Sequence, residues 1–164
     1  GDHAATVMAA RHGLTLPPEI QSDCAPLCHL TAEMIAAAGD GIAVLRDPTR
    51  GGAAASLNEL ASAAGVGVLL DEEQIPVRPA VQGVCEMLGF DPLTLANEGK
   101  LLAFVRPDVT AHVLDVMHEN PYGREACVIG HTTADAPGTV GLRTALGGIR
   151  VVDLPLGELV PRIC

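Results

Sequence analysis

Short apolar runs typical of buried strands alternate with longer helix-type segments along most of the chain, and this alternation constrains the fold most strongly. Strands are predicted at 42–46, 66–70, 101–105 and 127–132. Helices are predicted at 4–12, 25–38, 53–64, 80–88 and 109–118. The runs at 140–143 and 149–153 flank Gly147-Gly148 and predict an antiparallel hairpin. This order predicts an α+β fold in which a mixed β-sheet packs between helices.

The composition is that of a globular domain with an aliphatic core. Of the 164 residues, 48% are hydrophobic and only 2% are aromatic. A chain of this length buries enough apolar surface to fold as one domain. We expect that domain to span residues 1–153. A flexible tail is expected at 154–164, where prolines and a glycine interrupt any regular period.

The charge balance argues against two kinds of partner. The formal net charge is −10, and Lys100 is the only lysine. Without a basic patch to neutralise phosphates, we expect no binding to nucleic acid. We also expect no association with a membrane, because no apolar run reaches the length of a membrane span and no signal peptide is apparent.

The five cysteines do not form the spacing of a disulfide framework, which favours a reducing compartment and a cytoplasmic location. Cys24 and Cys28 lie four residues apart beside His29, but no further ligands accompany them, so we expect no metal site. Cys24, Cys28, Cys85 and Cys127 are interpreted as small buried hydrophobic residues.

The fifth cysteine, Cys164, is the last residue of the chain. Eleven residues, 154–164, follow Asp153, and an extended tail of that length reaches about 35–40 Å. Taken alone, Cys164 is either a chance terminal residue or a thiol that a tether carries between sites.

The segment 47–52, Asp-Pro-Thr-Arg-Gly-Gly, joins a predicted strand to a predicted helix. Gly51 and Gly52 let the backbone approach a ligand closely, and a helix N-terminus attracts anions. Arg50 offers a bidentate contact to phosphate, and Asp47 offers a metal ligand or a helix cap. The alternative is a helix start capped by Thr49, with no ligand. The lysine and spacing of a Walker A loop are missing.

The segment 96–100, Ala-Asn-Glu-Gly-Lys, precedes a predicted strand. Asn97 and Gly99 are turn residues, and Glu98 lies close to the single lysine. A carboxylate in such a position suits proton transfer. The alternative is an ordinary turn with a solvated Glu98–Lys100 ion pair. Near the start of the chain, His3 beside Asp2 is interpreted as structural.

Six segments together resemble the HypE family of hydrogenase maturation proteins, which are carbamoyl dehydratases. In chain order they read GDHA, APL, DPTRGG, IPVRP, ANEGK and PRIC. The resemblance covers essentially the whole chain and corresponds to the C-terminal half of that family. It implies a domain of the type found in aminoimidazole ribonucleotide synthetase. It also implies that an N-terminal domain is absent from this chain, in keeping with a start at Gly1 rather than methionine.

The resemblance gives Cys164 a function. It implies that the carbamoyltransferase HypF places a carbamoyl group on this thiol, that ATP-dependent dehydration yields a thiocyanate, and that the cyano group passes to the HypC–HypD complex. It further implies a homodimer, with ATP and Mg held mostly by the N-terminal domain. Glu98 is then expected to be the base. Asp47, Thr49, Arg50, Gly51 and Gly52 are expected to cradle phosphate, with Asn97 and Lys100 orienting Glu98 or contacting phosphate.

Two other functions remain open from the sequence. One is an amide-phosphorylating synthetase or small-molecule kinase of the same superfamily, in which Cys164 has no role. The other is a non-enzymatic docking module that presents an acidic surface and a tail to partner proteins. A thiol-redox role is disfavoured because no resolving cysteine can be assigned.

Overall fold

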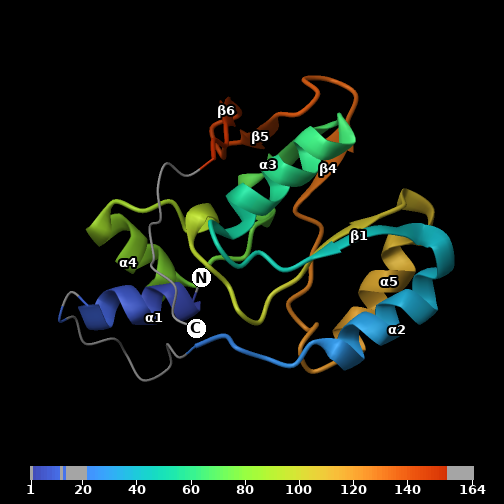
Figure 1. Ribbon diagram of the computed structural model, residues 1–164, viewed down its shortest axis with the longest axis horizontal. Coiled ribbons are helices and arrows are strands. Elements are labelled where there is room, and N and C mark those ends of the chain that lie inside the picture. The colour runs from blue at the N-terminus through green and yellow to red at the C-terminus, as the bar shows by residue number, and fades with distance from the viewer. Residues whose placement is uncertain (1, 12, 14–21, 155–164) are drawn as a thin grey trace.

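The predicted alternation of helices and strands is present in the structure, a computed structural model that describes residues 2–11, 13 and 22–154 (Figure 1). The α-helices are α1 (Asp2–Arg11), α2 (Cys28–Ala38), α3 (Gly52–Ala64), α4 (Pro79–Leu88) and α5 (Pro107–Glu119). The strands are β1 (Ile42–Arg46), β2 (Gly67–Asp71), β3 (Leu102–Val105), β4 (Gly130–Thr133), β5 (Val140–Arg143) and β6 (Ile149–Val151). Short 3-10 helices are η1 (Gly39–Gly41), η2 (Glu72–Gln74) and η3 (Pro92–Thr94). The α+β prediction is confirmed.

The described strands form two sheets. Four of them make a mixed sheet in the order β4-β2-β5-β6, in which β2 and β5 are parallel and the other neighbours are antiparallel. The hairpin of β5 and β6 was predicted. The remaining pair, β1 and β3, runs antiparallel as a separate two-stranded sheet with an irregularity between Ile42 and Val44.

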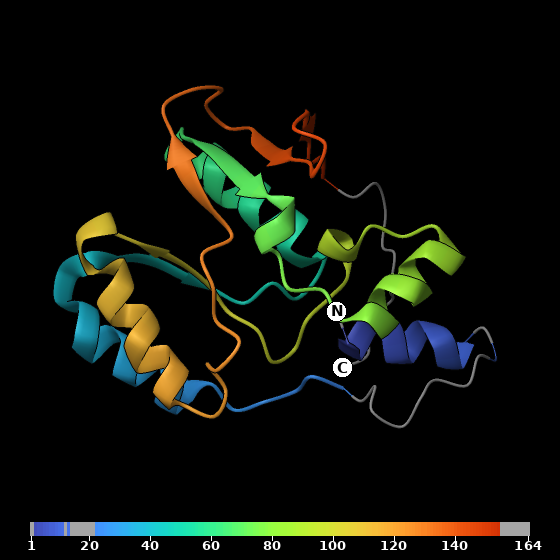
Figure 2. The same cartoon turned by 180° about the vertical axis from the view of Figure 1, so that it is seen from behind.

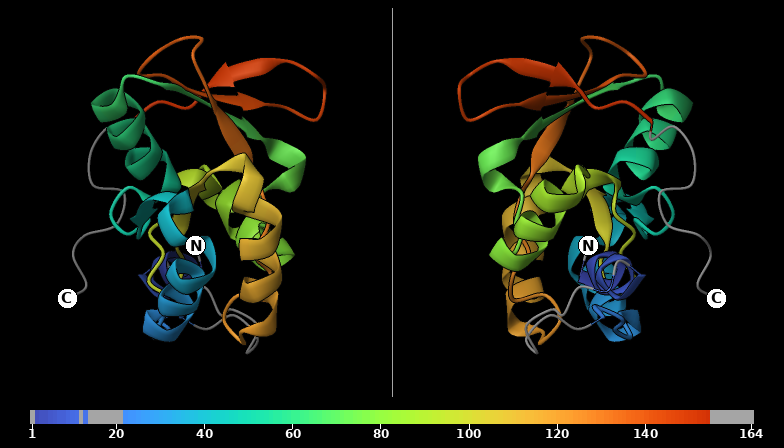
Figure 3. Two further views of the ribbon diagram at one scale, coloured as in Figure 1. Left: turned by 90° about the vertical axis from the view of Figure 1, so that its right-hand side faces the viewer. Right: turned by 90° about the vertical axis from the view of Figure 1, so that its left-hand side faces the viewer.

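The four-stranded sheet packs one face on α3. Ala54, Leu57 and Ala61 recur at helical spacing and form the buried stripe of α3. Val68, Leu70, Val140 and Leu142 of the sheet join this core, together with Leu93 and with Val152, which follows β6. Figure 3 shows the sheet at the top of the molecule, away from the other helices.

The two-stranded sheet packs on the helix pair α2 and α5. Leu30, Met34 and Ala38 of α2 meet Val113 of α5, and Ile42, Leu45 and Val105 of the strands lie against them. A third cluster joins Ala4 of α1 to Val81, Val84 and Cys85 of α4 and to Leu95. Figures 1 and 2 show the α1–α4 and α2–α5 pairs at opposite sides of the molecule, with the loops before α3 and β3 between them.

The prediction that four internal cysteines are buried is wrong for three of them. Cys85 is buried in α4, but Cys24, Cys28 and Cys127 are exposed. Cys127 is exposed because β4 begins only at Gly130, three residues after the predicted start of that strand. Cys24 lies before α2, which begins at Cys28 rather than Ala25. Pro26 keeps Ala25 out of the helix, because a proline disfavours helical geometry at the preceding residue.

Candidate functional site

The loop between β1 and α3 is shaped by two glycines with left-handed backbones. Gly51 has φ 71° and Gly52 has φ 63°, values that glycine adopts without strain. The N–H of Gly52 donates to the carbonyl of Thr49 at 3.1 Å, which closes a tight turn. Gly51 rather than Thr49 is the N-cap, and no side chain caps α3. The alternative in which Thr49 caps the helix is therefore wrong.

Gly52 also brings this loop against the segment that leads to β3. A Cβ atom at Gly52 would overlap the backbone carbonyls of Leu93 and Leu95. Only glycine permits this approach without displacing the backbone. The start of α3 and the chain from Leu93 onward are thus packed backbone to backbone.

Asn97 joins the two loops directly. Its backbone N–H donates to the carbonyl of Pro48 at 3.1 Å. Its side-chain Nδ2 donates to the carbonyls of Leu95 at 2.9 Å and of Pro48 at 3.4 Å. The Asn97 side chain is buried, so these bonds are shielded from water. The two motifs singled out from the sequence, 47–52 and 96–100, therefore form one structural unit.

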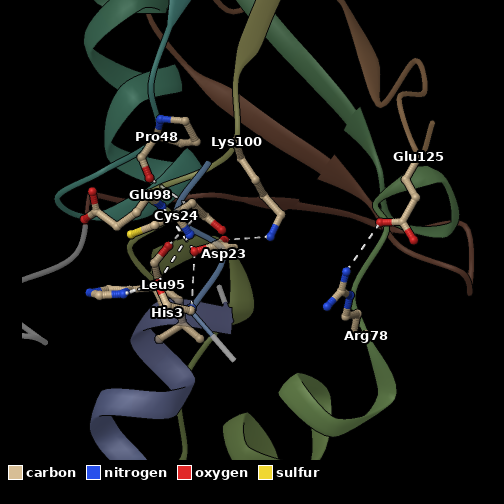
Figure 4. A network of polar contacts seen from close by, with 11 residues as sticks. His3, Asp23, Cys24, Pro48, Arg78, Leu95, Glu98, Lys100 and Glu125 are labelled. Carbon is tan, nitrogen blue, oxygen red and sulfur yellow. Dashed lines mark hydrogen bonds and ion pairs between the residues drawn. The ribbon is translucent and has the colours of Figure 1, made fainter. Parts of the chain in front are cut away.

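Asp23 is the centre of a polar network on the other side of this unit (Figure 4). Its Oδ1 accepts the backbone N–H groups of His3 and Glu98, each at 3.3 Å. Its Oδ2 lies 3.0 Å from Nζ of Lys100. Burial raises the pKa of the Asp23 carboxyl, but the hydrogen bond and charge of Lys100 and the N–H of Glu98 outweigh it, and the pKa is about 2.

Asp23 is not among the site residues predicted from the sequence, where Ser22 or Asp23 was expected to cap the helix predicted at 25–38. Leu27 is the N-cap of α2, and no side chain caps this helix. Two features of the sequence indicated a different role for Asp23. Pro26 separates Asp23 from the helix, and a chain with one lysine and excess carboxylates offers that lysine several partners.

Glu98 is exposed beside this network, at a bend with Gly99. Within the part of the chain that the structure describes, its side chain makes no hydrogen bond or ion pair. The Glu98–Lys100 ion pair considered from the sequence is replaced by the Asp23–Lys100 pair. Gly99 lets the bend form, because a Cβ there would overlap the carbonyl of Asp23.

The remaining predicted site residues differ in their exposure and in their contacts. Asp47, Thr49 and Arg50 are exposed at the loop before α3. Across residues 2–11, 13 and 22–154, no hydrogen bond or ion pair engages the side chains of Asp47 and Arg50, which leaves both accessible to a ligand. His3 has structural contacts, since its Nδ1 lies 2.8 Å from Oγ of Ser22. Cys164 and the predicted tail from 155 lie outside the described residues.

The described residues contain neither a metal-binding group of side chains nor a helix of membrane-spanning length. No three His, Cys, Asp or Glu side chains gather in them as a metal-binding group. None of the helices described is long and apolar enough to cross a membrane.

Comparison with known families defines the class of protein. The sequence profile of the C-terminal domain of AIR synthase related proteins matches residues 1–143. The chain therefore belongs to this family and represents its C-terminal domain.

Within this class, the chain is similar to HypE proteins. It is 52% identical over all 164 residues to carbamoyl dehydratase HypE of Rhodobacter capsulatus, and it covers 48% of that protein. A crystal structure of hydrogenase maturation protein HypE superposes with a TM-score of 0.93 at 40% identity, covering 100% of this chain and 53% of that one. The resemblance recognised from the six motifs is confirmed. The chain spans about half the length of the curated relatives it matches.

Two further structures show related proteins with bound molecules. HypE in complex with ATP matches with a TM-score of 0.90 at 40% identity, over 100% of this chain and 50% of that one. HypE in a HypE–HypF complex matches with a TM-score of 0.88 at 41% identity, over 94% of this chain and 50% of that one.

Proposed function

We propose that this chain is the C-terminal half of an ATP-dependent carbamoyl dehydratase that acts in the cytoplasm in hydrogenase maturation. The observation that supports this most directly is the bonding of Asn97 to Pro48, which places the Glu98 bend beside the glycine loop before α3. Such a dehydration requires a base and a loop that binds phosphate. The carbamoyl dehydratase relatives match over the full length of the chain.

In this proposal Cys164 carries the substrate. HypF transfers a carbamoyl group to the thiol, and the HypE–HypF complex of a related protein supports this partnership. The tail starts from a fixed point, because Val152 is buried and its N–H donates to Val140 at 2.8 Å. Nδ2 of Asn58 holds the carbonyl of Val152 at 2.7 Å. Beyond Val152, twelve residues span about 40 Å when extended, and in this proposal the tail brings the thiol to the Glu98 bend.

The chemistry removes water from a thiocarboxamide in two steps. The amide oxygen first takes the γ-phosphoryl group of ATP, while one N–H proton leaves to solvent and ADP is released, which converts a poor leaving group into a good one. Loss of the remaining N–H proton to Glu98 then forms the carbon–nitrogen triple bond and expels phosphate. The products are a thiocyanate on Cys164, ADP and phosphate. The cyano group then passes to the HypC–HypD complex.

The glycine loop suits the phosphate in this reaction. The start of α3 has no side-chain cap, so the first N–H groups after Gly52, whose own N–H is bonded to Thr49, are available to a ligand. Arg50 and Thr49 add exposed donors, and Asp47 offers a carboxylate to a phosphate-bound cation. Asn97 and Lys100 orient the Glu98 bend, through their contacts with Pro48 and Asp23.

The other half of the protein completes the site in this proposal. The described residues contain no group of three metal-ligating side chains. We propose that Mg is held mostly by the N-terminal half. The same half is proposed to bind most of the ATP and to form the homodimer.

The test is the intact mass of the full-length protein after incubation with carbamoyl phosphate, HypF and ATP. The expected result is a gain of one carbamoyl group at Cys164, followed by loss of one water that depends on ATP. Cys164→Ala should abolish both changes and the coupled ATP consumption. ATP turnover on a free small molecule that survives Cys164→Ala would instead identify a synthetase or kinase. Mass gain with no loss of water would leave only a docking role.

A further inference from the structure

We propose that HypF docks on the β5–β6 hairpin (140–151), with an apolar socket over Leu146 and contacts along the free edge of β6. The proposal rests on the function proposed above, in which HypF places a carbamoyl group on Cys164. A related HypE protein forms a complex with HypF.

Leu146 is an apolar side chain presented to solvent by a well-fixed turn. It is 99% exposed, the highest value among the large apolar side chains that the structure describes. The N–H of Gly147 closes the turn by donating to the carbonyl of Thr144 at 2.8 Å. The carboxylate of Glu72 accepts the N–H of Ala145 at 2.9 Å. Figure 3 shows the hairpin at the top of the molecule, with its turn extending to one side. An anchor presented on a fixed backbone loses little conformational freedom when a partner covers it.

Ile149 and Val151 continue this apolar surface along β6. They are 66% and 55% exposed, and alternate residues of a strand share a face. A Cβ at Gly141 would lie 3.2 Å from Ile149 and 3.4 Å from Leu69, which places these residues on the same face of the sheet. The neighbours of Gly141 in β5 belong to the core formed with α3, so this apolar face is turned away from α3.

The outer edge of β6 is open in the part of the chain that the structure describes, because β6 is last in the order β4-β2-β5-β6. Backbone bonds with β5 are made by Gly148 and Val152, on either side of the strand. Alternate residues of an antiparallel pair turn their N–H and C=O groups the other way, so those of Ile149 and Val151 are directed at the open edge.

The hairpin adds no net charge to this surface, although the chain has a formal net charge of −10. Its two charged side chains are both paired. Arg150 lies 2.7 Å from Asp91, and Arg143 lies 3.9 Å from Asp71. Natural proteins protect an open sheet edge with charge, proline or a bulge, or cover it. β6 contains no proline, its charge is paired and its pairing with β5 has no register shift, so cover by a partner is the remaining protection.

The tail indicates which partner this surface fits. β6 leads directly into Val152, whose N–H donates to Val140 at 2.8 Å and whose carbonyl accepts Nδ2 of Asn58 at 2.7 Å. Twelve residues then lead to Cys164, a span of about 40 Å when extended. A transferase docked on the hairpin therefore lies beside the start of the tail, and the thiol meets it at the high effective concentration of a tethered group.

The experiment measures the rate of carbamoyl loading against the concentration of the full-length protein, with HypF at a fixed low concentration. Leu146→Asp should raise KM for loading by about tenfold or more, with kcat within about twofold of wild type. Ile149→Thr should raise KM in the same direction. Both side chains are exposed, so the urea midpoints should change little. Met87→Asp is the matched control, because Met87 on α4 is 68% exposed and the charge change is the same. It should load with the wild-type KM.

Loading by cyanate isolates the docking step. The Cys164 thiol adds to the carbon of cyanic acid, its proton moves to the nitrogen, and the same carbamoyl group forms without HypF. Protein loaded in this way should lose water with ATP at the same rate in Leu146→Asp as in wild type.

The outcomes separate the docking surface from the proposed function. A wild-type KM for loading in both hairpin variants would overturn the docking surface and leave the proposed function standing. Slower dehydration of the cyanate-loaded variant, or a changed oligomeric state by light scattering, would assign the hairpin to the N-terminal half or to a second copy instead. Normal loading with slower transfer of the cyano group would assign it to HypC–HypD. If cyanate-loaded wild type never loses water, the proposed function fails, while the KM for loading still decides the docking surface.

Discussion

The backbone N–H of Asn97 donates to the carbonyl of Pro48 at 3.1 Å, and the Asn97 side chain donates to the same carbonyl at 3.4 Å. One residue thereby fixes the distance between the loop that precedes α3 and the bend that precedes β3. Because Asn97 is buried, no water is available to replace its side chain as a donor.

Replacement of Asn97 should therefore destabilise the fold. The loss in the free energy of unfolding should depend on the chemistry of the new side chain. Asn97→Ala removes the donor to Leu95 and should cost about 1–3 kcal/mol in the free energy of unfolding. Asn97→Asp should cost more, because it places carboxylate oxygens against two carbonyl oxygens. Urea denaturation of the 164-residue chain measures both. Stability of both variants equal to that of wild type would show that the side-chain donor is unimportant.

Gly52→Ala should destabilise the chain more than Gly65→Ala, although the two glycines have nearly the same φ, 63° and 65°. A Cβ at Gly65 meets nothing within 4 Å, so that substitution costs only the left-handed strain, about 1–2 kcal/mol. A Cβ at Gly52 also overlaps the carbonyls of Leu93 and Leu95. Parallel urea titrations should give a clearly larger loss for Gly52→Ala. Similar losses would mean that the backbone contact yields easily.

The local elements of this fold were predictable because each depends on a short sequence pattern. The apolar run 42–46 and the breakers around it predicted β1 with its observed ends. The division into two sheets was not predictable from such patterns. It depends on the pairing of β1 with β3, whose register joins Ile42 to Val105, far apart in the sequence.

The candidate site was predictable in part, because its two loops are also short sequence patterns. DPTRGG and ANEGK were recognisable as motifs, and the structure joins them through Asn97 and Pro48. Asp23 was missed because its partners lie 75 and 77 residues away, and a single sequence carries no record of that pairing. The roles of Glu98 and Cys164 remain predictions.

Acid should weaken the fold through Asp23. Its pKa is lowered from 3.8 to about 2 in the folded chain, so its ionised form stabilises the folded state above pH 3.8, and this contribution is lost as the pH falls toward 2. The contribution should be about 1–2 kcal/mol, since Lys100 is partly exposed and water screens the pair. Urea midpoints between pH 5 and pH 2.5 should fall less steeply in Asp23→Asn and in Lys100→Met than in wild type. Parallel curves for all three would refute the linkage.

Glu98→Gln should nearly abolish thiocyanate formation in the full-length protein while leaving carbamoylation of Cys164 intact. Glutamine keeps the size of the side chain and the backbone N–H bond to Asp23, but it cannot accept the amide proton. Loss of a general base typically lowers a rate by about 10²–10⁴-fold. Intact mass should therefore show the carbamoylated protein accumulating, with little loss of water on addition of ATP. Glu119→Gln, at the exposed end of α5, is the control and should behave as wild type. Normal dehydration by Glu98→Gln would exclude Glu98 as the base and direct the search to the N-terminal half.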